Sequence, residues 1–194
     1  MCCDSAIDLC KKASINSELR GYHYGAVFGV GNKPYPETAS FNHYRSCFRN
    51  EKGKRQYINC FHAERQALMK LINLCCRGYR NTKKYTITDL RRHLSKYTIF
   101  IVRTQMTPDS ALECGLNHST KREDCNYTLS SGKPCQDCVK MLQYYGIKKA
   151  VYTDMNGSII KVKIHNLILE EQFLSDSQKK FKKLREKIRQ EKKK

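Results

Sequence analysis

The sequence predicts a layered α/β domain, in which helices cover a central sheet. The chain has 194 residues, of which 40% are hydrophobic and 10% aromatic, enough for one domain with a buried core. Stretches with helical periodicity alternate with strand-like runs in the order helix, hairpin, helix, strand, helix, hairpin. No apolar run approaches the ~18 residues that a membrane-spanning helix needs, so we expect no membrane partner.

The N-terminal part predicts one helix and one β-hairpin. Helical spacing connects the apolar residues Ala6, Leu9, Cys10 and Ala13. A β-rich run over 24–30 follows and is broken by the turn-forming residues 31–34, so the chain can return as a second strand over 37–44.

The remaining elements alternate between helices and strands. A helix is predicted from His62 to Gly78, and another over 135–145. The strand predicted over 97–102 is apolar enough to lie at the centre of the sheet. Two further strands, over 149–154 and 159–164, are joined by Asn156-Gly157, which is typical of a tight antiparallel hairpin.

Three segments depart from this pattern. Residues 77–96 contain seven Lys or Arg against Asp89, residues 106–133 are polar without a clear period, and residues 177–194 contain ten Lys or Arg. We expect a domain over residues 1–176 with insertions at 77–96 and 106–133, followed by a basic tail over 177–194.

Charge and cysteine content narrow the classes of partner. Lys and Arg number 37 and Asp and Glu 18, a formal charge of +19, which favours anions such as nucleotides or nucleic acid. The first twenty residues lack the apolar core of a secretory signal, so we expect an intracellular protein, cytoplasmic or nuclear. Eleven cysteines in a reducing compartment indicate metal binding or buried thiols.

Two short motifs carry the chemistry. His62-Ala63-Glu64 begins the second predicted helix, and Cys135-Gln-Asp-Cys138 begins the third. One His and two Cys at this spacing supply three zinc ligands and leave the fourth tetrahedral position for water, which is typical of a catalytic site. The positive end of a helix also favours thiolates. Glu64, two residues after a ligand, can take the proton of a zinc-bound water.

His-x-Glu together with Pro-Cys-x-x-Cys is the signature of zinc deaminases of cytosine and adenine. Over residues 22–169 the chain resembles the cytidine deaminase superfamily. This resemblance implies a three-layer α/β fold with a central five-stranded mixed sheet, flanked by helices that include both motif helices. It also implies one Zn²⁺ on His62, Cys135 and Cys138, and hydrolytic deamination in which zinc-bound water attacks the amino-bearing ring carbon while Glu64 moves protons.

The same resemblance implies substrate contacts. The backbone N–H of Ala63 is expected to meet the base carbonyl, and Asn42, at the end of the second predicted strand, to contact base or sugar. Residues 45–55 are predicted to form a basic loop that passes the site, in which Arg45 and Arg49 can bind a 5′-phosphate through bidentate contacts. A solvated basic loop without a ligand is the alternative.

These features favour a deaminase of cytosine in a free nucleotide or nucleoside. The stretch 62–68 resembles free cytidine deaminases, whereas 138–140 and 146–152 resemble deoxycytidylate deaminases. Tyr44 stands where a nucleoside enzyme has an acid, and the absence of Trp removes a motif expected of polynucleotide-editing relatives.

Two alternatives stay open at this point. One is a deaminase of RNA or single-stranded DNA, indicated by Tyr79 and Tyr85 among basic residues and by the tail. The other is a non-catalytic nucleic-acid-binding protein that keeps the zinc scaffold. In either case the tail and the 77–96 insertion are the predicted nucleic-acid contacts. We also expect a homo-oligomer.

Overall fold

The structure is a computed structural model that describes residues 4–17, 23–49, 55–77, 86–110 and 125–167; of residues 44–49 and 55–60 it describes the backbone only. Its main sheet runs in the order β2-β1-β5-β7-β8, with β6 pairing with β5. The strands are β1 (His23–Val30), β2 (Lys33–Phe41), β5 (Tyr97–Met106), β6 (Tyr127–Ser130), β7 (Lys149–Thr153) and β8 (Ile159–Lys163). The β5–β7 pair is parallel and the other pairs are antiparallel, so the sheet is mixed.

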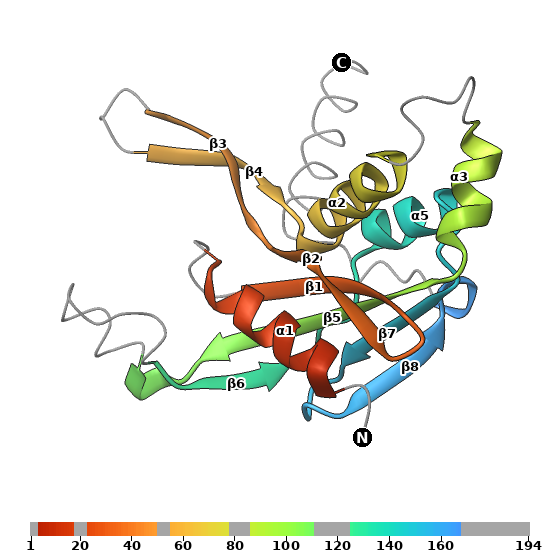
Figure 1. The fold of residues 1–194 in the computed structure, drawn as a ribbon. Coiled ribbons are helices and arrows are strands. Elements are labelled where there is room, and N and C mark those ends of the chain that lie inside the picture. The colour runs from red at the N-terminus through yellow and green to blue at the C-terminus, as the bar shows by residue number, and fades with distance from the viewer. Residues whose placement is uncertain (1–3, 18–22, 50–54, 78–85, 111–124, 168–194) are drawn as a thin grey trace, which may run out of the picture.

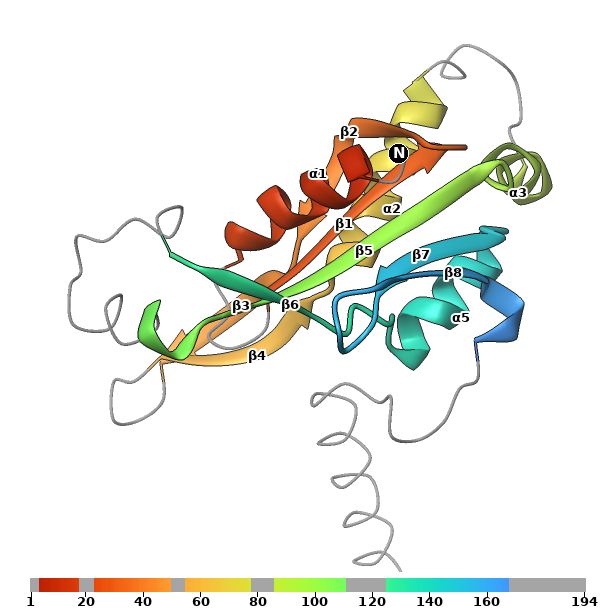
Figure 2. The ribbon, with the colours of Figure 1, turned by 90° about the horizontal axis from the view of Figure 1, so that it is seen from below.

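Helices cover both faces of this sheet, which gives three layers (Figures 1 and 2). Helix α1 (Asp4–Ile15) packs on one face, and helices α2 (Ala63–Arg77) and α5 (Gln136–Tyr144) pack on the other. The predicted three-layer α/β fold with a central mixed sheet is therefore confirmed.

Strand β5 explains how the two cores form. Ile99 and Ile101 face α2 and α5, whereas Phe100 and Val102 face α1. Because all four are essentially buried, neither face of this part of the strand is polar. Its sequence is therefore an uninterrupted apolar run. On the α1 side the helix lies so close to β1 that a Cβ at Gly25 would overlap a backbone carbonyl.

The hairpins at both ends of the main sheet agree with the sequence. β1 pairs with β2, and β7 with β8, across turns at Gly31 and Gly157 that both have positive φ. A short 3-10 helix, η2 (Ile164–Asn166), follows β8. In the described residues no helix is long and apolar enough to cross a membrane.

The region expected as a basic loop over 45–55 is different, and that prediction is wrong. Residues 45–49 and residue 55 belong to a separate two-stranded antiparallel sheet of β3 (His43–Arg49) and β4 (Arg55–Phe61), which projects from the main sheet (Figure 1), and residues 50–54 lie outside the described part. The charged residues in the middle of this stretch obscured the β-forming Tyr and Phe residues on either side of them.

The segments predicted as insertions contain regular elements. Helix α3 (Ile87–Leu94) lies within 77–96; Thr86 and Asp89 form a capping box at its start, and Leu90 and Leu94 are buried in the main core. Strand β6 lies within 106–133. Residues 78–85, 111–124 and the tail over 177–194 lie outside the described part of the chain, and the domain boundaries stay a prediction.

Candidate metal centre

The two motifs meet where α2 and α5 begin. His62 directly precedes α2, and its carbonyl accepts the N–H of Gln66 at 3.1 Å. Cys135 is the N-cap of α5, with its carbonyl accepting from Val139 at 3.0 Å, and Cys138 lies in the first turn. Since both helices lie on the same face of the sheet and contact each other, their N-termini bring the motif side chains together.

The chain that leads into α5 is held tightly against the sheet. Gly132 donates its N–H to the Thr153 carbonyl at 2.8 Å, and the Thr153 hydroxyl donates to the Ser130 carbonyl at 2.6 Å. A Cβ at Gly132 would lie 2.8 Å from the Ile101 carbonyl oxygen, so only glycine allows this close approach. This contact fixes where Cys135 emerges relative to the sheet.

The three donor atoms form one cluster. The Sγ atoms of Cys135 and Cys138 each lie 3.3 Å from Nδ1 of His62, and all three potential ligand atoms lie within 4.8 Å of one another. One imidazole nitrogen and two thiolate sulfurs are a donor set that suits zinc. The residues therefore fit the metal that the motifs predict, and among the described residues this is the only such group of three.

Mutual hydrogen bonds prepare the cluster for a cation. The hydrogen bond from Cys138, together with His62 and against the effect of burial, lowers the pKa of Cys135 to about 4, whereas the same bond and burial raise the pKa of Cys138 well above its usual value. Burial favours a neutral His62, but its hydrogen bond to Cys135 and the charge of Glu64 raise its pKa to about 9. Before metal is added, the cluster therefore holds a thiolate beside an imidazolium at neutral pH.

Metal binding should consequently depend steeply on pH. Zinc needs a neutral imidazole and two thiolates, so at neutral pH it displaces one proton from His62 and one from Cys138. Between the pKa of Cys135 near 4 and that of His62 near 9, we expect zinc affinity to rise with pH by about two powers of ten per unit. Competition with a chromophoric chelator between about pH 5 and 8 measures this; an affinity that does not change with pH would contradict the proposed ligand set.

Glu64 lies beside the cluster without belonging to it. It is the second residue of α2 and is only 3% exposed. Burial raises the pKa of its carboxyl group, while the positive charge of His62 opposes that rise, and the carboxyl hydrogen-bonds with the Cys138 side chain. A carboxyl group shielded from bulk water next to a metal centre is suited to exchange protons with a bound reactant.

Two residues that the motifs did not indicate also lie near the centre. Tyr24 and Arg103 are cross-strand partners on β1 and β5, with the Arg103 guanidinium carbon 5.7 Å from the centre of the Tyr24 ring. Burial raises the pKa of Tyr24 to about 12; Arg103 opposes the rise, and Glu64 and Cys135 add to it. The Tyr24 hydroxyl therefore lies within electrostatic reach of Glu64, Cys135 and Arg103.

Of the predicted substrate contacts, Ala63 and Asn42 lie in the described structure. Ala63 is the first residue of α2 and fully buried, and Asn42 is 4% exposed between β2 and β3. The Asn42 side-chain oxygen accepts the Tyr24 N–H at 2.7 Å, and its backbone carbonyl accepts the Ser17 hydroxyl at 2.8 Å. Asn42 thus ties β1 to the start of β3, and any contact with a base stays a prediction.

The side chains of Arg45 and Arg49 lie outside the described part, although both residues belong to β3. Their contact with a phosphate is therefore untested by the structure.

No protein-family model and no curated protein matches the chain. Among solved structures, the chain is similar to a cytidine deaminase from Burkholderia pseudomallei, at 16% identity over 87% of this chain and 97% of that chain, with a TM-score of 0.49. It is also similar to a dCMP deaminase from the cyanophage S-TIM5 in complex with dCMP and dUMP, at 17% identity over 78% and 76%, with a TM-score of 0.38. Identities and TM-scores this low assign no activity to this chain.

Proposed function

We propose that this protein is a zinc-dependent hydrolytic deaminase that acts on cytosine in a free nucleotide or nucleoside. The observation that carries the proposal is the buried carboxyl group of Glu64 next to the cluster of His62, Cys135 and Cys138. Three ligands from the protein leave one position for a reactant, and a neighbouring carboxylate that is not a ligand supplies acid–base chemistry.

In this mechanism each residue has a distinct role. His62, Cys135 and Cys138 would hold the zinc ion, which would lower the pKa of water and so supply a nucleophile at neutral pH. Glu64 takes a proton from the water molecule on its carboxylate oxygen and delivers it to the ring nitrogen. The water oxygen bonds to the amino-bearing carbon, and Glu64 then takes the remaining proton from this oxygen and transfers it to the amino nitrogen. The carbon–nitrogen bond breaks, ammonia leaves, and the oxygen stays as the carbonyl of uracil.

The substrate is positioned by groups around Glu64. The N–H of Ala63 belongs to the first turn of α2, where backbone N–H groups lack partners within the helix and can donate to a base carbonyl. Asn42 contributes its side-chain amide to base or sugar. Because the Asn42 oxygen also accepts the Tyr24 N–H, the position of the Asn42 side chain is fixed relative to β1, and a substrate bound by it would be held in a fixed position as well.

A contact of Arg45 and Arg49 with a 5′-phosphate predicts that nucleoside monophosphates are better substrates than nucleosides. If Arg45 and Arg49 bind the phosphate, replacing both with alanine should lower kcat/KM for cytidylate or deoxycytidylate by about 10²- to 10⁴-fold, because at least two hydrogen bonds to a charged group are lost and each contributes about 1.5–3 kcal/mol. Turnover of the matching nucleosides by the same variant should hardly change, so the nucleoside serves as the internal control.

The double lysine variant of Arg45 and Arg49 provides a second comparison. Lysine keeps the charge but loses the bidentate contact, so we expect an intermediate loss with the monophosphates. Equal losses on nucleoside and monophosphate would contradict a phosphate site at these residues.

A further inference from the structure

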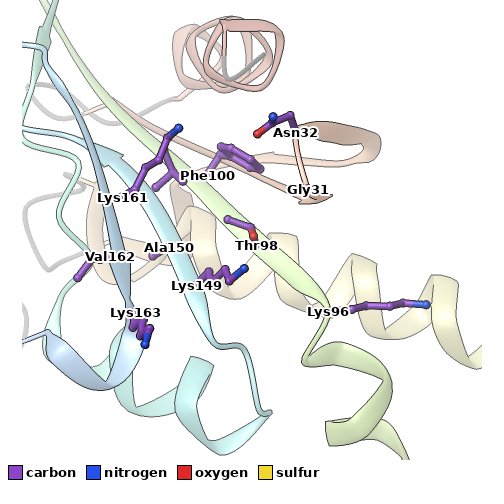
Figure 3. A pocket seen from close by; sticks show the side chains of 11 residues that line it. Gly31, Asn32, Lys96, Thr98, Phe100, Lys149, Ala150, Lys161, Val162 and Lys163 are labelled. Carbon is purple, nitrogen blue, oxygen red and sulfur yellow. The ribbon is translucent and has the colours of Figure 1, made fainter. Parts of the chain in front are cut away.

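The sheet face opposite the metal centre contains an open groove. Helix α1 packs against β1, β2 and β5, and the part of this face formed by β7 and β8 opens into a cavity of about 370 Å³. Figure 3 shows this groove between the turn that joins β1 to β2 and strand β8. Because α2 and α5 lie on the other face, the groove is separate from the site described above.

Four exposed lysines, Lys96, Lys149, Lys161 and Lys163, line the groove. Lys149 on β7 lies directly opposite Lys163 on β8, and Lys161 lies opposite Val151. Like charges at opposed positions of an antiparallel pair destabilise the sheet, so the Lys149–Lys163 arrangement costs stability unless an anion lies between them. Within the described residues no carboxylate forms a salt bridge with any of the four lysines.

The rest of the lining indicates what kind of anion fits. The floor consists of Thr98, Phe100 and Val151, which are all less than 9% exposed, so the groove offers no exposed ring on which a base could stack. It contains no arginine and therefore no planar fork that could read a base edge or one particular phosphate. Ammonium groups along an open channel instead suit a repeating backbone charge.

We propose that this groove binds the phosphodiester backbone of a nucleic-acid strand without reading its sequence. A strand has a phosphate at each nucleotide and can place successive charges against Lys149, Lys163 and Lys161, which relieves their mutual repulsion. The contact lies on the face of the sheet opposite Glu64 and does not depend on the deaminase activity proposed above.

The test compares two variants with the same net charge. In the full chain, Lys149, Lys161 and Lys163 are changed to glutamine in one variant, and Lys12, Lys140 and Lys148, which are exposed elsewhere, in the control. Binding of a fluorescent oligouridine is followed by anisotropy over a range of salt concentrations. The slope of log affinity against log salt should fall by about 2 in the groove variant, since each phosphate contact on a single strand contributes about 0.7.

The control should keep a slope close to that of the unmodified protein. Equal changes in both variants would show that only total charge matters and would overturn the proposal. Zinc content stays at its original level in either case, so failure here is distinguishable from failure of the metal centre. The groove variant should also melt at a slightly higher temperature in the absence of oligonucleotide, because the opposed charges are gone.

A second measurement uses the unmodified chain. Bound oligouridine should protect Lys149, Lys161 and Lys163 from an amine-reactive label more than it protects Lys12, Lys140 and Lys148. Absence of this protection while the oligonucleotide is bound would overturn the proposal. Equal protection by a polyglutamate peptide at the same charge concentration would place an acidic protein segment in the groove instead and would also contradict a nucleic-acid site.

Discussion

Replacing Glu64 with glutamine should abolish deamination while the fold and the bound zinc are retained. Glutamine has nearly the same shape but cannot accept a proton from water, and a positioned general acid–base group contributes about 10²- to 10⁴-fold to the rate. Glu64 has to move two protons in the proposed reaction, so we expect a loss at or beyond the upper end of that range. Rates of ammonia release and zinc content of the same preparation measure both quantities.

The exposed carboxylate of Glu37 on β2 supplies the matched control. Glu37→Gln should leave turnover unchanged, because this side chain lies in solvent. The Glu64→Gln variant should not unfold at a lower temperature, since it replaces a buried ionisable group by a neutral one. Turnover near that of the unmodified protein would remove Glu64 from the mechanism.

Removing either cysteine of the cluster should have the second large effect. The unmodified chain is expected to hold about one zinc ion, and Cys135→Ala and Cys138→Ala should each weaken zinc binding by more than about 100-fold, because even residues that only support a ligand contribute about 10- to 100-fold. Deamination should fall with the metal. Elemental analysis after dialysis against a weak chelator measures the zinc content.

Cys76 on α2 is the appropriate control, because it is a free cysteine that is not part of the cluster. Cys76→Ala should keep its zinc under the same dialysis. Undiminished zinc in both Cys135→Ala and Cys138→Ala would contradict the metal centre, whatever the activity of these variants.

The main sheet and its helices were predictable because each carries a local signal. The Asn156-Gly157 pair specifies a tight turn, the run over 97–102 has no polar face, and the helical spacing in α1 and α2 is regular. The hairpin β3–β4 was missed because it lies outside the main sheet, where no core imposes an alternation of apolar and polar residues. Helix α3 was missed for a related reason, since only Leu90 and Leu94 of its eight residues are buried.

The residues of the candidate site also differ in whether the local sequence gives a signal for them. His62, Cys135, Cys138 and Glu64 were predictable because zinc chemistry demands particular residue types at particular spacings. Tyr24 and Arg103 have no such motif, and they come near the centre only through the register in which β1 pairs with β5. That register depends on packing across the whole sheet, so a single sequence contains no local signal for it.

The most direct test of the central claim is deamination by the zinc-loaded full chain, followed by mass spectrometry. The substrates are cytidine, deoxycytidine, their monophosphates and short single strands that contain cytosine. We predict that cytosine becomes uracil in at least one free nucleotide or nucleoside, and that Glu64→Gln with the same zinc content forms no product. Turnover confined to the single strands would contradict the proposed substrate class, and absence of product from every substrate at full zinc occupancy would contradict the deaminase itself.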